Sequence, residues 1–130
     1  MKQIFCTVWT KEGRQELTEK QYLDLDSGKP HRLDGPAVEE PDGSKEWFVD
    51  GKEHRLDGPS FECPDGTKCW CVDGKRHRLD GPAYEWPDGS KEWWIDDKEL
   101  DTDEVETWLE DNKVNLSEPE GQMAFKLRWM

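Results

Sequence analysis

The sequence lacks any long apolar run, and hydrophobic residues make up only 32% of its 130 residues. A membrane-spanning helix needs roughly 20 consecutive apolar residues, so a span of this kind is excluded. The first residues, MKQIFCTVW, do not show the pattern of a secretory signal peptide. We therefore expect a soluble, cytoplasmic protein.

Basic residues are scarce as well, because 18 Lys and Arg stand against 31 Asp and Glu, for a formal net charge of −13. A negative surface repels both the phosphate backbone of nucleic acids and anionic membranes. We expect neither direct nucleic-acid binding nor membrane binding.

Cysteines are few and unevenly placed, which excludes the disulfide framework of a small secreted protein. We expect free thiols at Cys6, Cys63, Cys69 and Cys71. The spacing Cys63-x5-Cys69-x-Cys71 does not form the paired CxxC knuckles that are typical of zinc sites. The sequence predicts no metal site and no other cofactor.

Aromatic residues, in contrast, are plentiful: the chain has 8 Trp, 4 Phe and 2 Tyr. Low apolar content and negative charge are also typical of disordered chains, but those chains lack side chains that bury so much area. The composition therefore favours a folded protein with a small aromatic core.

An internal repeat dominates the chain. Residues 28–50, 51–73 and 74–96 follow one 23-residue pattern without insertion: GKPHRLDGPAVEEPDGSKEWFVD, GKEHRLDGPSFECPDGTKCWCVD and GKRHRLDGPAYEWPDGSKEWWID. Such a period is typical of arrays in which one supersecondary unit stacks on the next.

Each repeat has two runs of strand length, the first ending at Pro41-Asp42-Gly43 and the second at Asp50-Gly51. Both are strong turn signals, so each repeat is predicted to be a β-hairpin. With a four-residue loop, the register places Val38 opposite Trp47 and Glu40 opposite Lys45. It also places like charges together, Glu39 with Glu46 and Glu85 with Glu92, which indicates either a solvated face or a wrong register.

The predicted fold is mainly β (α+β), an antiparallel β-meander of three hairpin repeats with a C-terminal helical cap. We expect one compact domain, with an N-terminal strand and cap at 1–27, the repeats at 28–96 and an acidic helical segment at 97–130. The first segment is expected to contain a strand over 2–9, a turn over 11–13 and a helix over 18–25.

Two helices are expected in the last segment. Asp101 and Glu104 resemble a capping box, and the apolar face that follows is Val105, Trp108 and Leu109. A second helix is expected to start at Ser117, with Pro119 early in it and with Met123, Ala124 and Leu127 as its apolar members. These helices are predicted to close the end of the sheet or to cover its aromatic face.

The repeats resemble the MORN superfamily, in the variant whose units carry HRxDGPA, a Pro-Asp-Gly turn and a Trp-x-Val/Ile-Asp-Gly strand end. The resemblance covers residues 28–96, and the tail GQMAFKLRW is similar to the end of small proteins of tailed bacteriophages. It implies a β-meander and a non-catalytic binding role, in the cytoplasm of a host cell. The glycine and tyrosine pattern of ordinary MORN units is absent.

The candidate binding residues are the His, Arg and Trp residues that recur at equal positions in the three repeats and are expected to form rows along the array. Guanidinium groups suit phosphate or carboxylate and aromatic faces suit bases, so these rows are suited to a nucleotide. Alternatively the rows are structural, each Arg pairing with a neighbouring repeat's Asp and each His with a turn carbonyl. The residues concerned are His31, Arg32, Trp47, His54, Arg55, Trp70, His77, Arg78 and Trp93.

The acidic segment is a second candidate surface. Its carboxylates are suited to imitating a row of phosphates in the basic groove of a nucleic-acid enzyme, although acids near a helix start are also ordinary. The residues are Asp103, Glu104, Glu106 and Glu110.

No enzyme is predicted, because the acids of the shared motif recur in threes and nothing singles out a catalytic pair. The preferred hypothesis is a non-enzymatic, phage-type accessory protein that binds, and inhibits, a host protein such as a defence or nucleic-acid enzyme. The alternatives are a nucleotide-sequestering small-molecule binder and a structural virion or assembly component. An exposed terminal strand also leaves a homodimer open.

Overall fold

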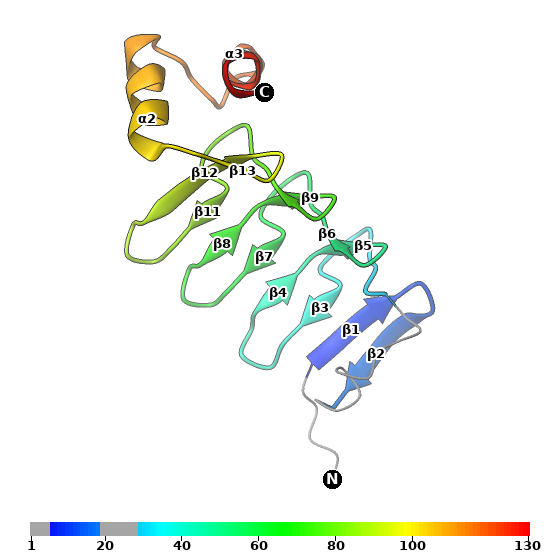
Figure 1. Cartoon of the computed structure of the whole chain (residues 1–130). Coiled ribbons are helices and arrows are strands. Elements are labelled where there is room, and N and C mark those ends of the chain that lie inside the picture. The colour runs from blue at the N-terminus through cyan, green and yellow to red at the C-terminus, as the bar shows by residue number, and fades with distance from the viewer. Residues whose placement is uncertain (1–5, 19–28) are drawn as a thin grey trace.

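The computed structural model describes residues 6–18 and 29–130 and shows a mainly β chain with two helices in its last third (Figure 1). The helices are α2 (Thr102–Asp111) and α3 (Pro119–Trp129). The strands are β1 (Cys6–Thr10), β2 (Gly13–Leu17), β3 (Val38–Glu39), β4 (Lys45–Glu46), β5 (Phe48–Val49), β6 (Lys52–Glu53), β7 (Phe61–Glu62), β8 (Lys68–Cys69), β9 (Cys71–Val72), β10 (Lys75–Arg76), β11 (Tyr84–Glu85), β12 (Lys91–Ile95) and β13 (Lys98–Leu100).

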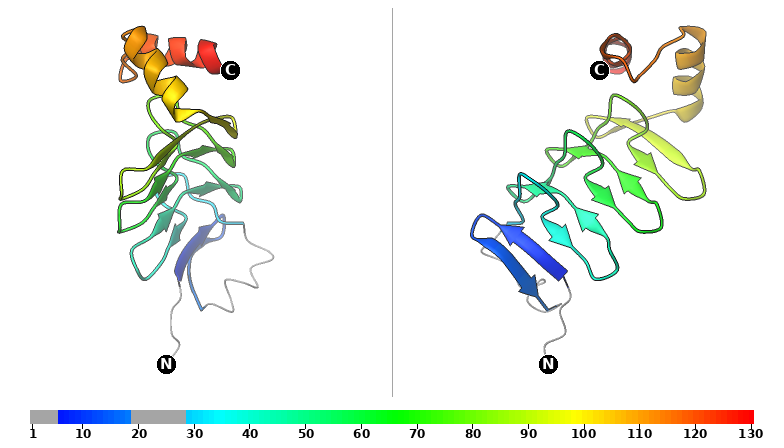
Figure 2. Two further views of the ribbon diagram at one scale, coloured as in Figure 1. Left: turned by 60° about the vertical axis from the view of Figure 1, so that its left-hand side comes forward. Right: turned by 180° about the vertical axis from the view of Figure 1, so that it is seen from behind.

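The main sheet is antiparallel and has nine strands in the order β13-β12-β11-β8-β7-β4-β3-β1-β2. Strands β5 and β6 form a small sheet of their own, as do β9 and β10. The hairpins follow one another along an elongated molecule, with β1 and β2 at one end and the helices at the other (Figures 1 and 2). The mainly β (α+β) class with a long antiparallel sheet is confirmed.

The Pro-Asp-Gly turn is one residue shorter than the sequence prediction assumed. The Glu40 amide donates to the Ser44 carbonyl at 2.9 Å, and Gly43 has a φ of 98°. A three-residue loop with Gly in this conformation closes a hairpin with a bulge. As a result Val38 pairs with Glu46 and Glu39 with Lys45, so the predicted pairs of Val38 with Trp47 and of Glu40 with Lys45 were wrong.

The corrected register removes the like-charge pairs. Glu85 pairs with Lys91 rather than with Glu92, just as Glu39 pairs with Lys45 rather than with Glu46. Consecutive strands then place opposite charges side by side on one face, which is favourable across strands. This Glu/Lys ladder runs through Glu39, Lys45, Glu62, Lys68, Glu85 and Lys91.

In the first two repeats the second run leaves the main sheet at its tryptophan, whereas in the third repeat β12 continues within the sheet to Ile95. At Trp47 the backbone turns to the next repeat: its amide donates to the Ser60 carbonyl at 2.7 Å, and its carbonyl accepts from the His54 amide at 3.0 Å. Trp70 makes the equivalent bonds to Ala83 and His77. The residues after each Trp leave the sheet and form the small hairpins β5–β6 and β9–β10.

The small hairpins close at Asp-Gly turns, as predicted. Asp50 and Gly51 have φ values of 51° and 78°, and Val49 pairs with Lys52 across them. Positive φ at both central residues is the type I′ geometry that the twist of paired strands favours. Asp97 takes the place of glycine in the last turn, with a φ of 67°.

The first hairpin substitutes for a repeat at its end of the array. The turn was predicted over 11–13; in the structure Thr10 pairs with Gly13, so the turn consists of Lys11 and Glu12 and Gly13 belongs to β2. Trp9 then bonds as the repeat tryptophans do: its amide donates to the Ala37 carbonyl and its carbonyl accepts from the His31 amide, both at 2.7 Å. The strand predicted over 2–9 is Cys6–Thr10 in the described residues, and the helix predicted over 18–25 lies outside them, save for Thr18.

The helices close the other end of the array. Asp101 caps α2 by accepting from the Glu104 amide at 2.9 Å, which confirms the predicted start. The core there consists of Trp93, Ile95, Leu100, Val105 and Phe125, with Trp108, Leu109 and Trp129 packed against it.

The second helix buries a different face from the predicted one. It begins at Pro119 with Glu118 before it, rather than at Ser117. Its inward residues are Phe125 and Trp129, whereas Met123 and Leu127 are 56% and 75% exposed. Residues four apart share a helix face, so the contact of Phe125 with Trp93 decides which face turns inward.

Candidate functional site

The predicted arginine and tryptophan rows come together as stacks between neighbouring repeats. The Arg55 Cζ lies 4.0 Å from the centre of the Trp47 ring, and Arg78 lies 3.7 Å from Trp70. Arg32 stacks on Trp9 at 4.1 Å. Each guanidinium thus covers the ring of the preceding unit, a cation–π contact that joins the two units.

The polar atoms of these arginines bind their own loops. Arg55 Nε donates to Asp57 at 3.0 Å, and Nη1 donates to the Pro59 carbonyl at 3.0 Å. Arg32 and Arg78 make the same contacts in their loops. The prediction that each Arg pairs with a neighbouring repeat's Asp was therefore wrong, because Asp lies only two residues away within the same loop.

Glycine in the loop makes room for the guanidinium. A Cβ added at Gly58 would lie 2.8 Å from the Arg55 Cζ, and the equivalent distance is also 2.8 Å at Gly35 and Gly81. This close approach is the physical reason for Gly in the HRLDG stretch.

The histidines hold the Asp-Gly turns. His31 Nδ1 accepts from the Asp50 amide at 3.0 Å, His54 from Asp73 at 3.0 Å and His77 from Asp96 at 3.1 Å. The predicted contact with a turn is present, but its partner is an amide rather than a carbonyl. An accepting Nδ1 places the ring proton on Nε2.

Two clefts lie between successive HRLDG loops. One has a volume of about 720 Å³ and is lined by Arg32, Leu33, Trp47, His54, Arg55 and Leu56, among others. The next, of about 530 Å³, is lined by Arg55, Leu56, Trp70, His77, Arg78 and Leu79, among others. The leucines at their rims, Leu33 and Leu56, are 81% and 80% exposed.

Trp93 does not belong to this row. It is only 4% exposed, and its ring lies 5.7 Å from that of Phe125, which takes the place of a following arginine. Its strand pairs Trp93 with Leu100, the residue that stands where a histidine would stand. Trp93 is therefore part of the C-terminal core.

The predicted acidic residues lie on α2, where two of them are paired. Glu106 binds Lys91 at 2.7 Å, and Glu104 binds Arg128 at 3.2 Å. No ion pair involves Asp103 or Glu110 in the described part of the chain. These two ion pairs neutralise part of the negative charge, so fewer unpaired carboxylates line this helix than the sequence predicted.

A third surface was missed by the sequence prediction. The three repeats are nearly identical, and their larger differences fall at a few positions of the unit that share one side of the main sheet. We call these residues the variable face: Val38, Glu40, Glu46, Phe48, Glu53, Phe61, Cys63, Cys69, Cys71, Arg76, Tyr84, Trp86, Glu92 and Trp94. Val38, Cys69 and Cys71 are buried, so the accessible part of this face is formed by the others. Other differences are small, such as Ala37 for Ser60 or Ser44 for Thr67.

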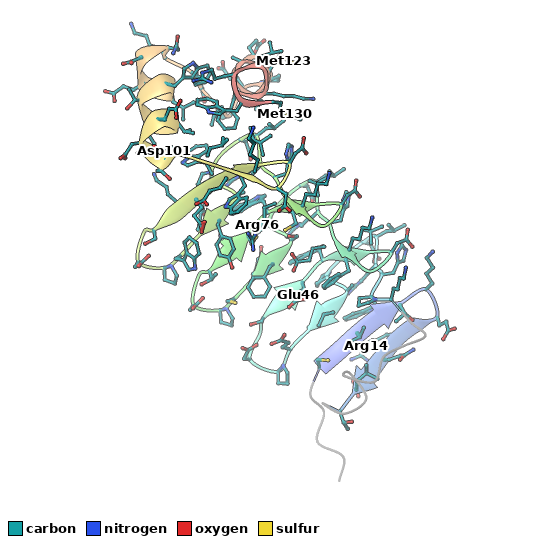
Figure 3. The ribbon with its side chains drawn as sticks, in the orientation of Figure 1. Arg14, Glu46, Arg76, Asp101, Met123 and Met130 are labelled. Atoms are coloured by element: carbon teal, nitrogen blue, oxygen red, sulfur yellow. The ribbon has the colours of Figure 1, made fainter. Side chains whose placement is uncertain are left out.

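Strand register and side-chain contacts place these residues together. Val38, Glu46, Phe61, Cys69, Tyr84 and Glu92 form one cross-strand row. The small hairpins turn their side chains toward that row: Arg76 lies 4.7 Å from the Trp94 ring and 5.9 Å from the Tyr84 ring. Figure 3 shows Glu46 and Arg76 on this face. Differences between the repeats were the signal that could have located it.

Two thiols of the variable face are buried together. The Sγ atoms of Cys69 and Cys71 lie 3.8 Å apart, and all four cysteines of the chain are free thiols, as predicted. The hydrogen bond with Cys69 and burial raise the pKa of Cys71, which stays protonated at neutral pH. No group of three or more potential metal ligands occurs in residues 6–18 and 29–130.

Glu46 is the most perturbed carboxyl group of the variable face. Burial, and then the nearby charges of Glu53 and Glu40, raise its pKa to about 7. No ion pair to Glu46 or Glu53 exists among the described residues. The positive charge on this face belongs to Arg76, which lies against Trp94 and Tyr84 rather than in an ion pair with these carboxyl groups.

Comparisons with known proteins give no family for the chain. No protein-family model matches it, and searches of curated proteins and of solved structures found no significant match. Among the described residues, no helix has the length and apolar character required to cross a bilayer.

Proposed function

We propose that this chain is a non-enzymatic accessory protein that binds a protein partner through its variable face. The observation that carries this proposal is that the invariant and the variable residues of the repeat lie in different surroundings. Arg, His and Trp of the invariant motif are engaged in intramolecular contacts, whereas the side chains that change from repeat to repeat gather on one face.

The kinds of residue that differ between the repeats support a binding role for the variable face. Where one repeat has Val38, the others have Phe61 and Tyr84, and where one has Glu40, another has Trp86. Phe61, Tyr84 and Trp86 are half-buried rather than fully packed. Large aromatic side chains on a surface are the residues that most often anchor a protein interface.

The resemblance to tailed-bacteriophage proteins suggests the source of the partner. We propose a bacterial host protein, such as a defence or nucleic-acid enzyme that the complex inhibits. The fold as a β-meander of MORN-like repeats belongs to the same proposal, since the recurring contacts at intervals of 23 residues support it. The absence of a distinct catalytic pair supports a non-enzymatic role.

Affinity capture from bacterial lysate tests this function. We expect the wild-type chain to retain one stoichiometric protein, and the Trp86→Ala/Trp94→Ala variant to lose it. A matched Leu33→Ala/Leu56→Ala variant changes the exposed leucines of the loops and is expected to retain the partner. Circular dichroism confirms that both variants fold. Loss with the loop variant alone would assign the interface to the clefts and contradict the proposal.

A nucleotide is a second candidate ligand, favoured by the size and lining of the two clefts. Their volumes of about 530 and 720 Å³ are those of small-molecule sites. The arginines, however, already donate Nε and Nη1 to their own loops. A thermal shift with one cyclic or linear nucleotide, lost in Arg55→Ala, would favour this function. A third candidate, a virion or assembly component, would be found in purified particles.

A further inference from the structure

The variable face offers a binding place for a cation in its middle part. Phe48 pairs with Glu53 across the β5–β6 hairpin, and Glu46 pairs with Phe61 across the main sheet. The His54 amide donates to the Trp47 carbonyl at 3.0 Å, which brings the preceding residues, Glu53 and Glu46, close together, and the charge of Glu53 acts on Glu46. Two carboxylates and two aromatic rings therefore surround one part of the face.

The equivalent part of the next repeat shows which chemical group binds in these surroundings. There the position of Glu53 is taken by Arg76, whose guanidinium lies over the Trp94 ring and near the Tyr84 ring. The aromatic part of the face thus already holds one cation that belongs to the chain itself. One repeat earlier Phe61 stands in place of Tyr84 and Cys71 in place of Trp94, while Glu53 takes the place of Arg76 and Glu46 that of Cys69.

We propose that the variable face binds a segment of the partner protein that carries lysine or arginine side chains, with a cationic group placed between Glu46 and Glu53 against Phe61. This rests on the proposed function. Ammonium and guanidinium groups are stabilised both by carboxylates and by aromatic faces. Burial penalises a lone carboxylate, and an opposite charge nearby reverses that penalty.

The negative charge of the chain favours a basic segment over a second copy of the chain or a nucleic acid as the ligand of this face. The chain carries a net charge of −13, so a second copy or a nucleic acid would bring like charge to an acidic surface. A basic segment meets complementary charge, which speeds its approach and fixes its register.

Nuclear magnetic resonance of the full-length, ¹⁵N-labelled chain tests the proposal. The probes are a short lysine- and arginine-containing peptide and a matched peptide with glutamate in their place. We expect the basic peptide to shift the indole signals of Trp86 and Trp94 and the amide of Phe61. The indoles of Trp9, Trp47 and Trp70, covered by arginines, serve as internal controls and stay in place.

Two variants test whether the cationic group of the peptide binds between Glu46 and Glu53. In Glu46→Gln/Glu53→Gln, which keeps side-chain size, we expect the Kd for the basic peptide to rise about tenfold. Glu62→Gln, on the opposite Glu/Lys ladder, is the matched control and leaves the Kd unchanged. Equal binding of the acidic peptide, shifts confined to the control indoles, or an unchanged Kd in the double variant would overturn the proposal.

Failure here is distinct from failure of the proposed function. A lysate partner that Trp86→Ala/Trp94→Ala loses, but that binds Glu46→Gln/Glu53→Gln as well as wild type, would keep the function and reject the basic segment. Absence of any partner lost by the tryptophan variant would reject the function itself.

Discussion

The guanidinium of Arg55 lies 4.0 Å above the indole of Trp47, which belongs to the preceding repeat. The same guanidinium binds Asp57 and the Pro59 carbonyl of its own loop. One side chain therefore orders a loop and joins two repeats. This double use explains why the motif is repeated unchanged along the chain.

Replacing Arg55 is expected to weaken this junction. Arg55→Ala removes the cation–π contact and three hydrogen bonds, to Asp57, to the Pro59 carbonyl and to Glu62, and should lower the free energy of unfolding by about 2 kcal/mol. Arg55→Lys should be nearly as damaging, because an ammonium group does not reproduce the planar donor geometry. Urea denaturation measures both. The control is Arg14→Ala, because Arg14 is more exposed, pairs with nearby Glu16 and lies farther from a ring, 5.8 Å from that of Trp9; an equal loss there would contradict the argument.

Adding one methyl group at Gly58 tests the space beside the same guanidinium. Its Cβ would lie 2.8 Å from the Arg55 Cζ, so Gly58→Ala should displace the side chain and cost about 1–3 kcal/mol. In an Arg55→Ala background the methyl group meets no guanidinium and should cost much less. A double-mutant cycle by denaturation measures this coupling, and strict additivity would show that the glycine serves another purpose.

Stability should depend on pH through Glu46. The folded state holds its proton up to a pKa of about 7, whereas the unfolded chain releases it near 4.5. The free energy of unfolding therefore falls as pH rises from 4.5 to 7, and the loss is complete above that range. Glu46→Gln removes this part of the slope and should melt a few degrees higher than wild type at pH 8. Thermal unfolding across pH measures it, and parallel curves would contradict the prediction.

The C-terminal core should depend on Phe125. It is fully buried and contacts the Trp93, Trp108 and Trp129 rings, so Phe125→Ala should lower the free energy of unfolding by about 3–5 kcal/mol. Leu127, two residues away and 75% exposed, is the matched control, and Leu127→Ala should change stability by less than about 0.5 kcal/mol. The reverse order of effects would show that the predicted face of the helix is the buried one.

Local signals in the sequence predicted much of the fold. The Asp50-Gly51 turn, the hairpin at Pro41 to Gly43 and the cap at Asp101 each follow from the chemistry of a few adjacent residues. The side-chain register did not, because a Pro-Asp-Gly stretch is compatible with loops of three or four residues. That one-residue difference moved Trp47 out of its predicted pair with Val38.

The candidate site was predicted in part. The Arg, His and Trp rows do lie together, since in-register repeats carry equal residues to equal places. Their partners were not predictable, because the stack of Arg55 on Trp47 depends on how far one unit lies from the next. Trp93 was assigned to the row, and only the position of Phe125 shows that it belongs to the core.

By itself the sequence determined the repeating unit, its turns, its acidic charge and the helical end, because these depend on composition and on contacts between near neighbours. The tertiary structure alone decided which side chains hold neighbouring repeats together and which lie on the variable face. The chain leaves the main sheet after Trp47 and Trp70, whose backbones bond with the next repeat, and the small hairpins that follow lie beside residues of that repeat. Residues far apart in each repeat, such as Arg76 and Trp94, thereby meet on the variable face.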